Sequence, residues 1–280
     1  MKQNEKEKEL RFEPSKLPFF TSEIRQEEYP RLIPSKPEKL IKLDITDLER
    51  IDRFKKLYGG CVSDAMHLNG IVDTVVTPDI KPLKSHDIIA GRAVPIKWHS
   101  LAPEIHLTKE QMLERQAKWD KEGSPQKHMH DALFPGSILV FDNGGDTQAA
   151  LFGEMSCNLA QARGCMGVIN NGLTRDCRYV MKLNNFPYFT RGTTPNSYGG
   201  WRVIGVNEPI YLPGHMKHYV IVNPGDFVFG DDDGLQIIPE PYVDTVLVKA
   251  EEIFSFEEQE RAMIAGGMPI SEVYEKFGDL

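Results

Sequence analysis

The hydrophobic positions of the chain form short apolar runs, which are separated by polar segments with helical spacing. A short apolar run bounded by Gly, Pro, Asn or Asp is typical of a β-strand. Because strands alternate with helices in the middle of the chain and then follow one another closely, the pattern predicts a layered α/β fold. The predicted strands are 80–83, 90–97, 138–142, 166–170, 187–189, 210–212, 219–222, 227–230 and 235–238.

Helical spacing of the apolar residues predicts helices between these strands. The first begins at the N-cap Asp44 and ends before the pair Gly59-Gly60. The segment 231–234 favours a tight hairpin over a calcium loop, because it lacks the spaced ligands and terminal Glu of an EF-hand. A loop is predicted at 120–125. The other predicted helices are 63–68, 107–119, 153–164 and 243–263.

The chain divides into three predicted parts. Residues 1–42 are rich in Lys, Glu and Pro and have no sustained periodicity, so they are predicted to be an arm. Apolar pieces of this arm, at 17–20 and 29–33, are expected to dock on the body of the protein or on a neighbouring subunit. Residues 43–245 form the predicted main α/β domain, and residues 246–280 form a C-terminal helical extension.

Composition and charge narrow the possible classes of protein. The 280 residues include 41 acidic and 33 basic side chains, which gives a formal net charge of −8. This balance argues against a general nucleic-acid binder. No apolar run approaches the length of a membrane span, and the charged start of the chain is unlike a signal peptide. The four cysteines lack CxxC spacing, so a reduced, cytoplasmic protein without a membrane partner is expected.

The most informative stretch runs from residue 152 to residue 176. Gly153 precedes a predicted helix, an apolar strand follows, and a glycine turn then delivers the adjacent pair Arg175-Asp176. A helix N-terminus presents unpaired N–H groups, which suit an anionic ligand. Arg offers a planar fork for a carboxylate, and Asp offers a hard oxygen for a divalent cation. These residue types together predict a site for a metal-bound keto acid.

A set of motifs in a fixed order extends this interpretation. They are Ser63–Met66, Gly91–Val94, Pro135–Asp142, Gly153–Met155, Gly164–Ile169, Gly172–Asp176, Phe189–Pro195 and Pro224–Pro239. With this set the chain closely resembles, over roughly residues 45–265, the RraA-like proteins. That family includes the class II 4-hydroxy-4-methyl-2-oxoglutarate/4-carboxy-4-hydroxy-2-oxoadipate aldolases. The resemblance implies an α-β-β-α sandwich of the swivelling phosphohistidine-domain type. It also implies homotrimers or homohexamers with active sites between subunits.

The resemblance implies a role for each residue near the helix start. Arg175 corresponds to the arginine that binds the pyruvyl group, and Asp176 to the carboxylate that ligates Mg²⁺ or Mn²⁺. Glu154 corresponds to the acid that orients a catalytic water. The backbone N–H groups of Met155 and Ser156 correspond to those that hold the substrate carboxylate.

Three further positions belong to the candidate site on the same grounds. Gly153 is grouped with the substrate-binding backbone of the helix start. Arg191 either faces the pocket or pins its own turn. In some family aldolases an acid from the C-terminal region of a neighbouring subunit assists the reaction, and Glu258 is the candidate for that role here.

The same residues also have purely structural interpretations. An arginine such as Arg175 is often part of a surface salt bridge, which contributes little to stability. Asp176, taken alone, would be a solvated or capping group, and Glu154 would be a favourable acid in the first turn of a helix. The family resemblance is what favours the functional interpretation over these.

Several positions depart from the family pattern. Asn171 stands where many members have Asp, and Tyr179 replaces an acid that often follows the Arg-Asp pair by three positions. Residues from about 101 to 130 form an insertion, in which His128 and His130 invite a metal-binding interpretation. Side chains at i and i+2 face apart on a helix, so a subunit contact or a pocket wall is the preferred interpretation.

The predicted function is a divalent-metal-dependent aldolase that cleaves a 4-hydroxy-2-oxo acid to pyruvate and a second carbonyl product. Decarboxylation of oxaloacetate forms the same enolate and is expected as a side reaction. A non-catalytic regulator that binds a ribonuclease or a helicase is the alternative. Such regulators typically lack the Asp after the Arg, which this chain keeps as Asp176. The sequence does not identify the second product.

Overall fold

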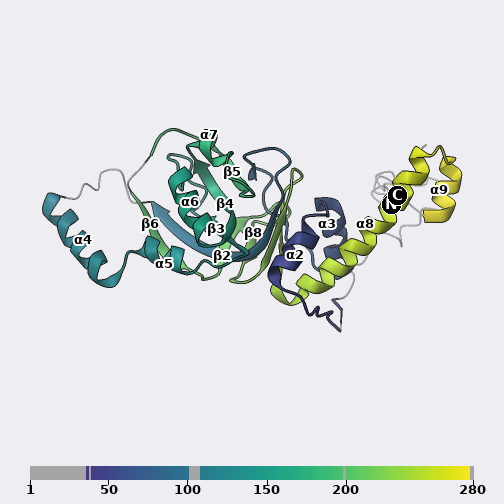
Figure 1. Cartoon of the computed structure of the whole chain (residues 1–280), viewed down its shortest axis with the longest axis horizontal. Helices are drawn as coiled ribbons and strands as arrows, with labels where there is room; N and C mark the ends of the chain where they lie inside the picture. The colour runs from purple at the N-terminus through teal and green to yellow at the C-terminus, as the bar shows by residue number, and fades with distance from the viewer. Residues whose placement is uncertain (1–35, 38, 101–107, 198–199, 278–280) are drawn as a thin grey trace, which may run out of the picture. The chain divides into compact units, whose positions relative to one another are not determined.

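The computed structural model of this chain describes residues 36–37, 39–100, 108–197 and 200–277. All of them fall in the unit that spans residues 35–280, and the predicted arm lies almost wholly outside the described residues. Strands and helices are both abundant and pack in layers, which confirms the predicted α/β class (Figure 1). At the end of the predicted arm, the backbone N–H of Ile41 donates to Thr245 Oγ1 at 2.9 Å.

The main sheet has the strand order β1-β5-β4-β3-β2-β9-β10, with β6 paired to the far part of β2. Strands β2 to β5 are mutually parallel, and the outer pairs are antiparallel. A separate antiparallel pair consists of β7 (Ile210–Pro213) and β8 (Tyr219–Val222). The main-sheet strands are β1 (Lys81–Pro82), β2 (Ile89–Ser100), β3 (Ser137–Asp142), β4 (Cys165–Thr174), β5 (Tyr188–Thr193), β6 (Trp201–Val206), β9 (Phe227–Gly230) and β10 (Leu235–Ile238).

Alternate side chains of the parallel strands enter different cores, because successive residues of a strand point to opposite faces. On β3, Leu139 and Phe141 pack in a core that includes residues of three helices. Ile138 and Val140 pack in another core together with β7 and β8. The sheet therefore lies between a helical layer and a small second sheet. The three helices are α5 (Pro125–Asp131), α6 (Glu154–Ala162) and α7 (Cys177–Val180).

A third core joins α2 (Asp47–Phe54), α3 (Gly59–Leu68) and α8 (Val243–Ala265) to strand β9. Phe54 stacks on Phe227 with 4.6 Å between ring centroids. Figure 1 shows α8 running beside α2 and α3, in agreement with their shared core. The predicted C-terminal helix is confirmed with nearly its predicted bounds.

The first two helices correct the predicted boundaries. The N-cap of α2 is Thr46 rather than Asp44, because Thr46 and Glu49 form a reciprocal capping box. The pair Gly59-Gly60, predicted to end a helix, instead opens α3. The backbone N–H of Gly59 donates to Asp231 Oδ2 at 2.6 Å, and an added Cβ would lie 2.9 Å from Asp231 Oδ1. A close tertiary contact, rather than helix termination, explains this glycine.

Other differences lie at and after the predicted insertion. Helix α4 (Lys109–Glu122) continues into the predicted loop at 120–125, and Ser124 caps α5, so the loop is shorter than predicted and comprises only residues 123–124. Strand β6 and helix α9 (Ile270–Phe277) were not predicted. Strand β6 depends on pairing with the distant β2, which a local pattern does not reveal. A 3₁₀ turn at Glu240–Tyr242 leads into α8.

Candidate functional site

The pair Arg175-Asp176 lies directly after β4, at the C-terminal edge of the parallel strands. The predicted glycine turn at Gly172 was wrong, because the strand continues to Thr174 through an irregularity in its pairing with β5. Gly172 instead makes room for a side chain of the loop after β3. An added Cβ there would lie 2.1 Å from Asn143 Nδ2, so the glycine allows the loop after β3 to approach β4. Ligands of open α/β sheets commonly bind at this edge.

The N-terminus of α6 packs directly against the Arg-Asp pair, as the sequence predicted. Gly153 is the N-cap of α6, and no side chain of the N-cap residue is available to close the helix. A Cβ at Gly153 would lie 2.4 Å from Asp176 Oδ2 and 3.1 Å from Arg175 Cγ. Real Cβ atoms do not approach a polar atom that closely. Only glycine therefore permits the helix start and the carboxylate to meet.

The side chain of Asp176, which lies outside α6, caps the N-terminus of this helix. Its Oδ2 accepts the backbone N–H of Glu154 at 3.4 Å, and Arg175 Nε lies 3.6 Å from the same oxygen. Both side chains keep over two-fifths of their surface exposed, 42% for Arg175 and 45% for Asp176. The contact between them is long for a hydrogen bond, so the guanidinium remains available to a ligand. The capping interpretation of Asp176 and the ligand-binding one are compatible.

The backbone N–H groups of Met155 and Ser156, in the first turn of α6, have no acceptor within the helix. The first N–H groups of an α-helix have no intrahelical partner. Among the described residues, no hydrogen bond reaches the backbone N–H of Met155 or of Ser156. Met155 is 75% exposed, so the surface at this turn is open to a ligand. The arrangement supplies two donors and the positive end of a helix dipole beside Arg175.

Glu154 occupies the first turn of α6 and is half-buried. The Asn158 side-chain amide donates both to Glu154 Oε1 and, at 3.2 Å, to the Glu154 carbonyl oxygen. This contact orients the carboxylate without neutralising it. The predicted role of Glu154 in holding a water stays a prediction.

Arg191 lies on β5 and is held by two other side chains. Its Nε donates to Asn171 Oδ1 at 2.8 Å, and its Nη1 donates to Asp79 Oδ2, also at 2.8 Å. Of the two open interpretations, these contacts support the one in which Arg191 pins its turn. They also give the side-chain oxygen of Asn171 a hydrogen-bond donor. A role for Arg191 in substrate binding stays a prediction.

A buried polar network beneath the site was missed by sequence reasoning. The carbonyl oxygen of Phe152 accepts from Thr174 Oγ1 and from Tyr188 Oη, each at 3.2 Å. Asn170 Nδ2 donates to Tyr188 Oη at 3.1 Å. Burial raises the pKa of Tyr188, so its hydroxyl stays protonated and can donate. The signal in the sequence was a polar residue, Asn170, within an apolar strand.

This network holds backbone in a sparsely populated conformation. Phe152 and Asp176 both have positive φ, 63° and 60°. Left-handed backbone costs free energy for most residues and persists only where the surroundings impose it. The two residues flank Gly153 and Arg175, so the unusual conformations set the positions of the candidate site residues.

The insertion contributes one side chain that touches this region. The His130 ring stacks on Phe152 with 6.3 Å between ring centroids, whereas His128 is exposed. The two imidazoles lie on α5 and differ in environment, in agreement with the expectation that they face apart. Glu258 lies on α8, where it accepts from Arg261 Nη1 at 2.7 Å. Its predicted contribution to a neighbouring subunit stays a prediction.

Among the described residues, no group of three or more His, Cys, Asp or Glu side chains is placed to hold a metal ion. The residues present fit a divalent cation that is held by one protein carboxylate together with a bound substrate. Mg²⁺ keeps several waters and binds through one or two carboxylates together with its substrate. The exposed carboxylate of Asp176 supplies one such oxygen beside donors for an anion. The buried thiols are poor ligands, because burial raises the pKa of Cys61 to about 12 and that of Cys165 to about 11.

Comparison with known proteins identifies the family. A family model described as Aldolase/RraA, RraA-like, matches residues 60–237. A Halalkalibacterium halodurans protein named "Putative 4-hydroxy-4-methyl-2-oxoglutarate aldolase" is 31% identical over 232 residues, which cover 82% of this chain and 96% of that protein. The chain belongs to the RraA-like family. The matched RraA-like region contains the whole candidate site from Gly153 to Arg191, whereas Glu258 lies beyond it.

Two solved structures share the RraA-like fold. An uncharacterized protein from Pseudomonas syringae pv. tomato has a TM-score of 0.64 at 21% identity, covering 83% of this chain and 99% of that one. Streptomyces coelicolor RraAS2 is described as an unusual member of the RNase ES inhibitor RraA protein family. It has a TM-score of 0.61 at 20% identity, covering 78% of this chain and 99% of its own. Within the described part of the RraA-like chain, every helix is too short or too polar to span a membrane.

Proposed function

We propose that this RraA-like protein is a lyase that cleaves a 4-hydroxy-2-oxo acid to pyruvate and a second carbonyl compound, with Mg²⁺ or Mn²⁺ bound at Asp176. The observation that carries the proposal is the packing of the α6 N-terminus on Arg175-Asp176, which only a glycine at position 153 permits. That packing places two free N–H groups, a guanidinium and a carboxylate around one exposed surface. The aldolase name of the Halalkalibacterium halodurans relative supports the same reaction class.

The chain's own groups suit the two ends of a 2-oxo acid. The N–H groups of Met155 and Ser156 would bind the substrate carboxylate, with help from the helix dipole. The guanidinium of Arg175 would donate to the 2-oxo oxygen. That oxygen becomes an enolate when the C3–C4 bond breaks, so the hydrogen bond strengthens in the transition state. A bound divalent cation would supply further positive charge at these oxygens.

Cleavage also needs a base for the C4 hydroxyl. Glu154 lies one residue from the N-cap and is oriented by Asn158. We assign to it the task of holding a water that removes the hydroxyl proton as the C3–C4 bond breaks. Decarboxylation of oxaloacetate forms the same enolate but removes no hydroxyl proton. It would therefore proceed as a side reaction that needs Arg175 but not Glu154.

A second candidate function is a non-catalytic regulator that binds a ribonuclease or a helicase. The Streptomyces coelicolor structure of similar fold is described as belonging to an RNase inhibitor family, and this favours the alternative. The retained Arg175-Asp176 pair and the open helix start favour the enzyme. A protein that acts only by binding an RNase does not need an arginine, a carboxylate and free N–H groups gathered at one exposed surface.

One experiment separates the two functions. Pyruvate release from a panel of 4-hydroxy-2-oxo acids is measured with Mg²⁺, with Mn²⁺ and with a chelator. We expect metal-dependent turnover that falls by more than about tenfold in Arg175→Lys, because a point charge does not reproduce the fork. The exposed Arg178→Lys is the matched control on α7. If none of the compounds yields pyruvate with either metal, the non-catalytic regulator becomes the better interpretation.

A further inference from the structure

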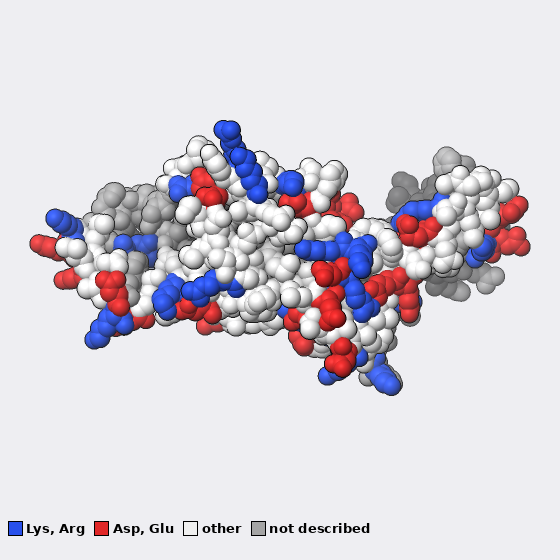
Figure 2. All heavy atoms as spheres, viewed as in Figure 1, with Lys and Arg blue, Asp and Glu red and all other residues white. Residues whose placement is uncertain are grey.

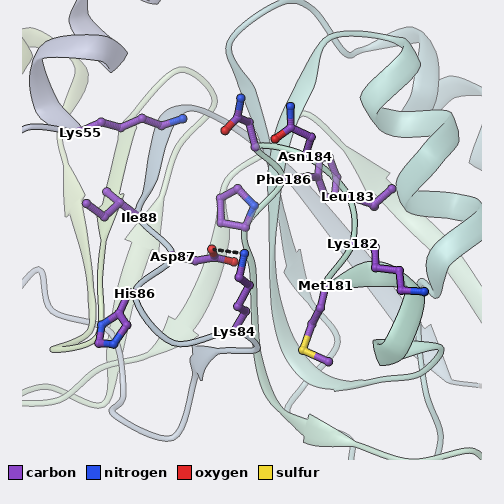
Figure 3. Close-up of a pocket in the computed structure, with 12 residues that line it drawn as sticks. Lys55, Lys84, His86, Asp87, Ile88, Met181, Lys182, Leu183, Asn184 and Phe186 are labelled. Atoms are coloured by element: carbon purple, nitrogen blue, oxygen red, sulfur yellow. Dashed lines mark ion pairs between the residues drawn. The ribbon is translucent and has the colours of Figure 1, made fainter.

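A second concave site lies at the opposite edge of the parallel strands from Arg175-Asp176. It is formed by the end of α2, by the segment 84–88 before β2 and by the segment 181–187 before β5 (Figure 3). The segment 181–187 leads into the N-terminal end of β5, whereas Arg175 follows the C-terminal end of β4. Because β4 and β5 are parallel, the two sites lie at different ends of the strands. We call this concave site the lysine pocket.

The charge of the lysine pocket is strongly positive. Lys55, Lys84 and Lys182 line it, with Asp87 as the lining carboxylate among the described residues. Lys84 Nζ lies 3.9 Å from Asp87 Oδ1, which is the outer limit of an ion pair. Three lysines and one carboxylate give the lining an excess of two positive charges, and the Lys182 amino group lies over the Tyr179 ring, 5.1 Å from its centroid. The His86 Nδ1 atom lies 2.7 Å from Asp232 Oδ2, and Asp232 is not among the residues that line the pocket.

Lys55 is the lysine whose environment most needs an anion. It ends α2 and is half-buried, and among the described residues no carboxylate forms an ion pair with its amino group. Figure 3 shows its side chain extended toward the other lining residues. Burial lowers the pKa of Lys55, because the charged form loses hydration. Asp52 and Asp87 oppose this shift without forming an ion pair with Lys55, so a bound anion would further offset the cost of desolvating its half-buried ammonium.

The walls of the pocket have a fixed shape. His86 and Asn185 both have positive φ, 68° and 53°. The backbone N–H of His86 donates to Asp232 Oδ1 at 3.0 Å, and Gln161 Nε2 donates to the Asn184 carbonyl oxygen at 2.8 Å. Residues in this region of conformational space persist only where tertiary contacts hold them. These contacts support both loops in the conformation that forms the pocket.

We propose that the lysine pocket binds a small phosphorylated ligand, separately from the site at Arg175-Asp176. A phosphate monoester carries nearly two negative charges at neutral pH, which matches the excess of two positive charges among the lining residues. Lysines bind phosphate groups as point charges, as the lysine of the P-loop does. Ile88, Met181 and Leu183 flank the lysines and would contact the carbon part of the ligand.

The test is a calorimetric titration of the intact protein with phenyl phosphate and with inorganic phosphate. We expect one bound equivalent per chain, and a dissociation constant weakened by about tenfold or more in Lys55→Met. Methionine keeps the apolar stem of the side chain but removes its charge. Lys84→Met, at a 58% exposed side chain, gives the same test if Lys55→Met folds poorly. The matched control is the exposed neighbour Lys56→Met, which should bind as the wild type does.

Three results would overturn the proposal. The first is absence of binding at millimolar phosphate. The second is a dissociation constant that is the same in Lys55→Met, Lys84→Met and Lys56→Met. If phosphate binding were lost only in Arg175→Met, the anion would instead bind at the site formed by Arg175 and Asp176. The third is tighter binding of malonate than of phenyl phosphate with the same dependence on Lys55, which would assign the pocket to dicarboxylates.

Discussion

At the residue scale, Asp176 combines two roles that a pair of substitutions separates. Its side chain accepts the N–H of Glu154, and its backbone is left-handed, with φ of 60°. Asn keeps an acceptor and tolerates this conformation, whereas Ala does neither. We expect Asp176→Asn and Asp176→Ala both to abolish metal-dependent pyruvate release. Only Asp176→Ala should lower the free energy of unfolding, by about 1 kcal/mol. Pyruvate-coupled turnover and urea unfolding check this, and near wild-type turnover in Asp176→Asn would refute the metal-ligand role.

Glu154 allows a second prediction at this scale, because its two possible tasks have different kinetic signatures. If it holds the water that deprotonates the C4 hydroxyl, Glu154→Gln should slow aldol cleavage by ~10²–10⁴. Oxaloacetate decarboxylation should survive much better, because no hydroxyl proton is removed. If Glu154 only stabilises the helix start, worth ~0.3–1 kcal/mol, both rates should change little and together. Equal and severe losses would instead assign it to construction of the metal site. The ratio of the two rates in one purified variant decides.

At the scale of elements, the junction between α6 and the end of β4 has no room for another atom. Gly153→Ala would place its Cβ 2.4 Å from Asp176 Oδ2 and 3.1 Å from Arg175 Cγ, so the Asp176 carboxylate must move away from the helix start or the backbone must shift. We expect a loss of ~1–3 kcal/mol in the free energy of unfolding, as for other overpacked positions. Turnover should fall with it. Gly266→Ala, at the C-cap of α8, is the control, with an allowed φ of −74°. A Gly153→Ala variant with unchanged stability and activity would show that the junction adjusts freely.

The contact between α5 and the candidate site predicts a dependence on pH. Burial, and secondarily the charge of Arg163, lowers the pKa of His130 below its ordinary value of about 6.5, while Asp131 opposes the shift. The unfolded chain therefore binds a proton at a higher pH than the folded protein does. The stability contributed by neutral His130 is complete above about pH 6.5 and is lost as the pH falls through its lower folded-state pKa.

The substitution His130→Phe tests this dependence while keeping the ring stacked on Phe152. Chemical unfolding between pH 7 and pH 5 should show a weaker loss of stability in His130→Phe than in the wild type. The exposed His128→Phe on the same helix should keep the wild-type pH profile. If the free energy of unfolding depends on pH in the same way in all three proteins, His130 does not cause the loss of stability at low pH.

At the scale of the whole molecule, the outer face of the β7–β8 pair is apolar. Tyr211, Tyr219 and Ile221 are 52%, 63% and 50% exposed, and the two tyrosine rings meet edge to face at 6.4 Å. Contiguous exposed apolar surface of this kind commonly marks an interaction site. On the face seen in Figure 2, acidic and basic side chains are interspersed, so this face does not carry charges of a single sign.

These features and the family resemblance predict a homotrimer or a dimer of trimers. Light scattering at micromolar protein concentration should give three or six times the 31.8 kDa mass of the chain. Ile221→Lys should lower the measured mass if β7 and β8 contribute to the contact, and the exposed Lys217→Ala is a neutral comparison. A monomer in the wild-type protein would contradict the assembly and would remove Glu258 from consideration as a residue of a neighbouring site.

The sequence alone predicted the class of fold and most of the candidate site. Strands β8, β9 and β10 have their predicted bounds, because a short apolar run bounded by turn residues is a local pattern. The meeting of Gly153 with Arg175-Asp176 was also foreseen. A helix N-terminus and a basic-acidic pair have recognisable chemistry, and the ordered motifs placed them in one family.

Tertiary structure alone decided which contacts hold these elements in place. The Gly59-Gly60 pair opens a helix because Asp231 lies against it, and position 172 of β4 needs a glycine because Asn143 lies against it. The support of Phe152 by Tyr188 joins residues 36 positions apart. Such contacts depend on long-range packing and leave no periodic signal in the chain. The local pattern therefore determined the elements and the candidate chemistry, and packing determined their geometry.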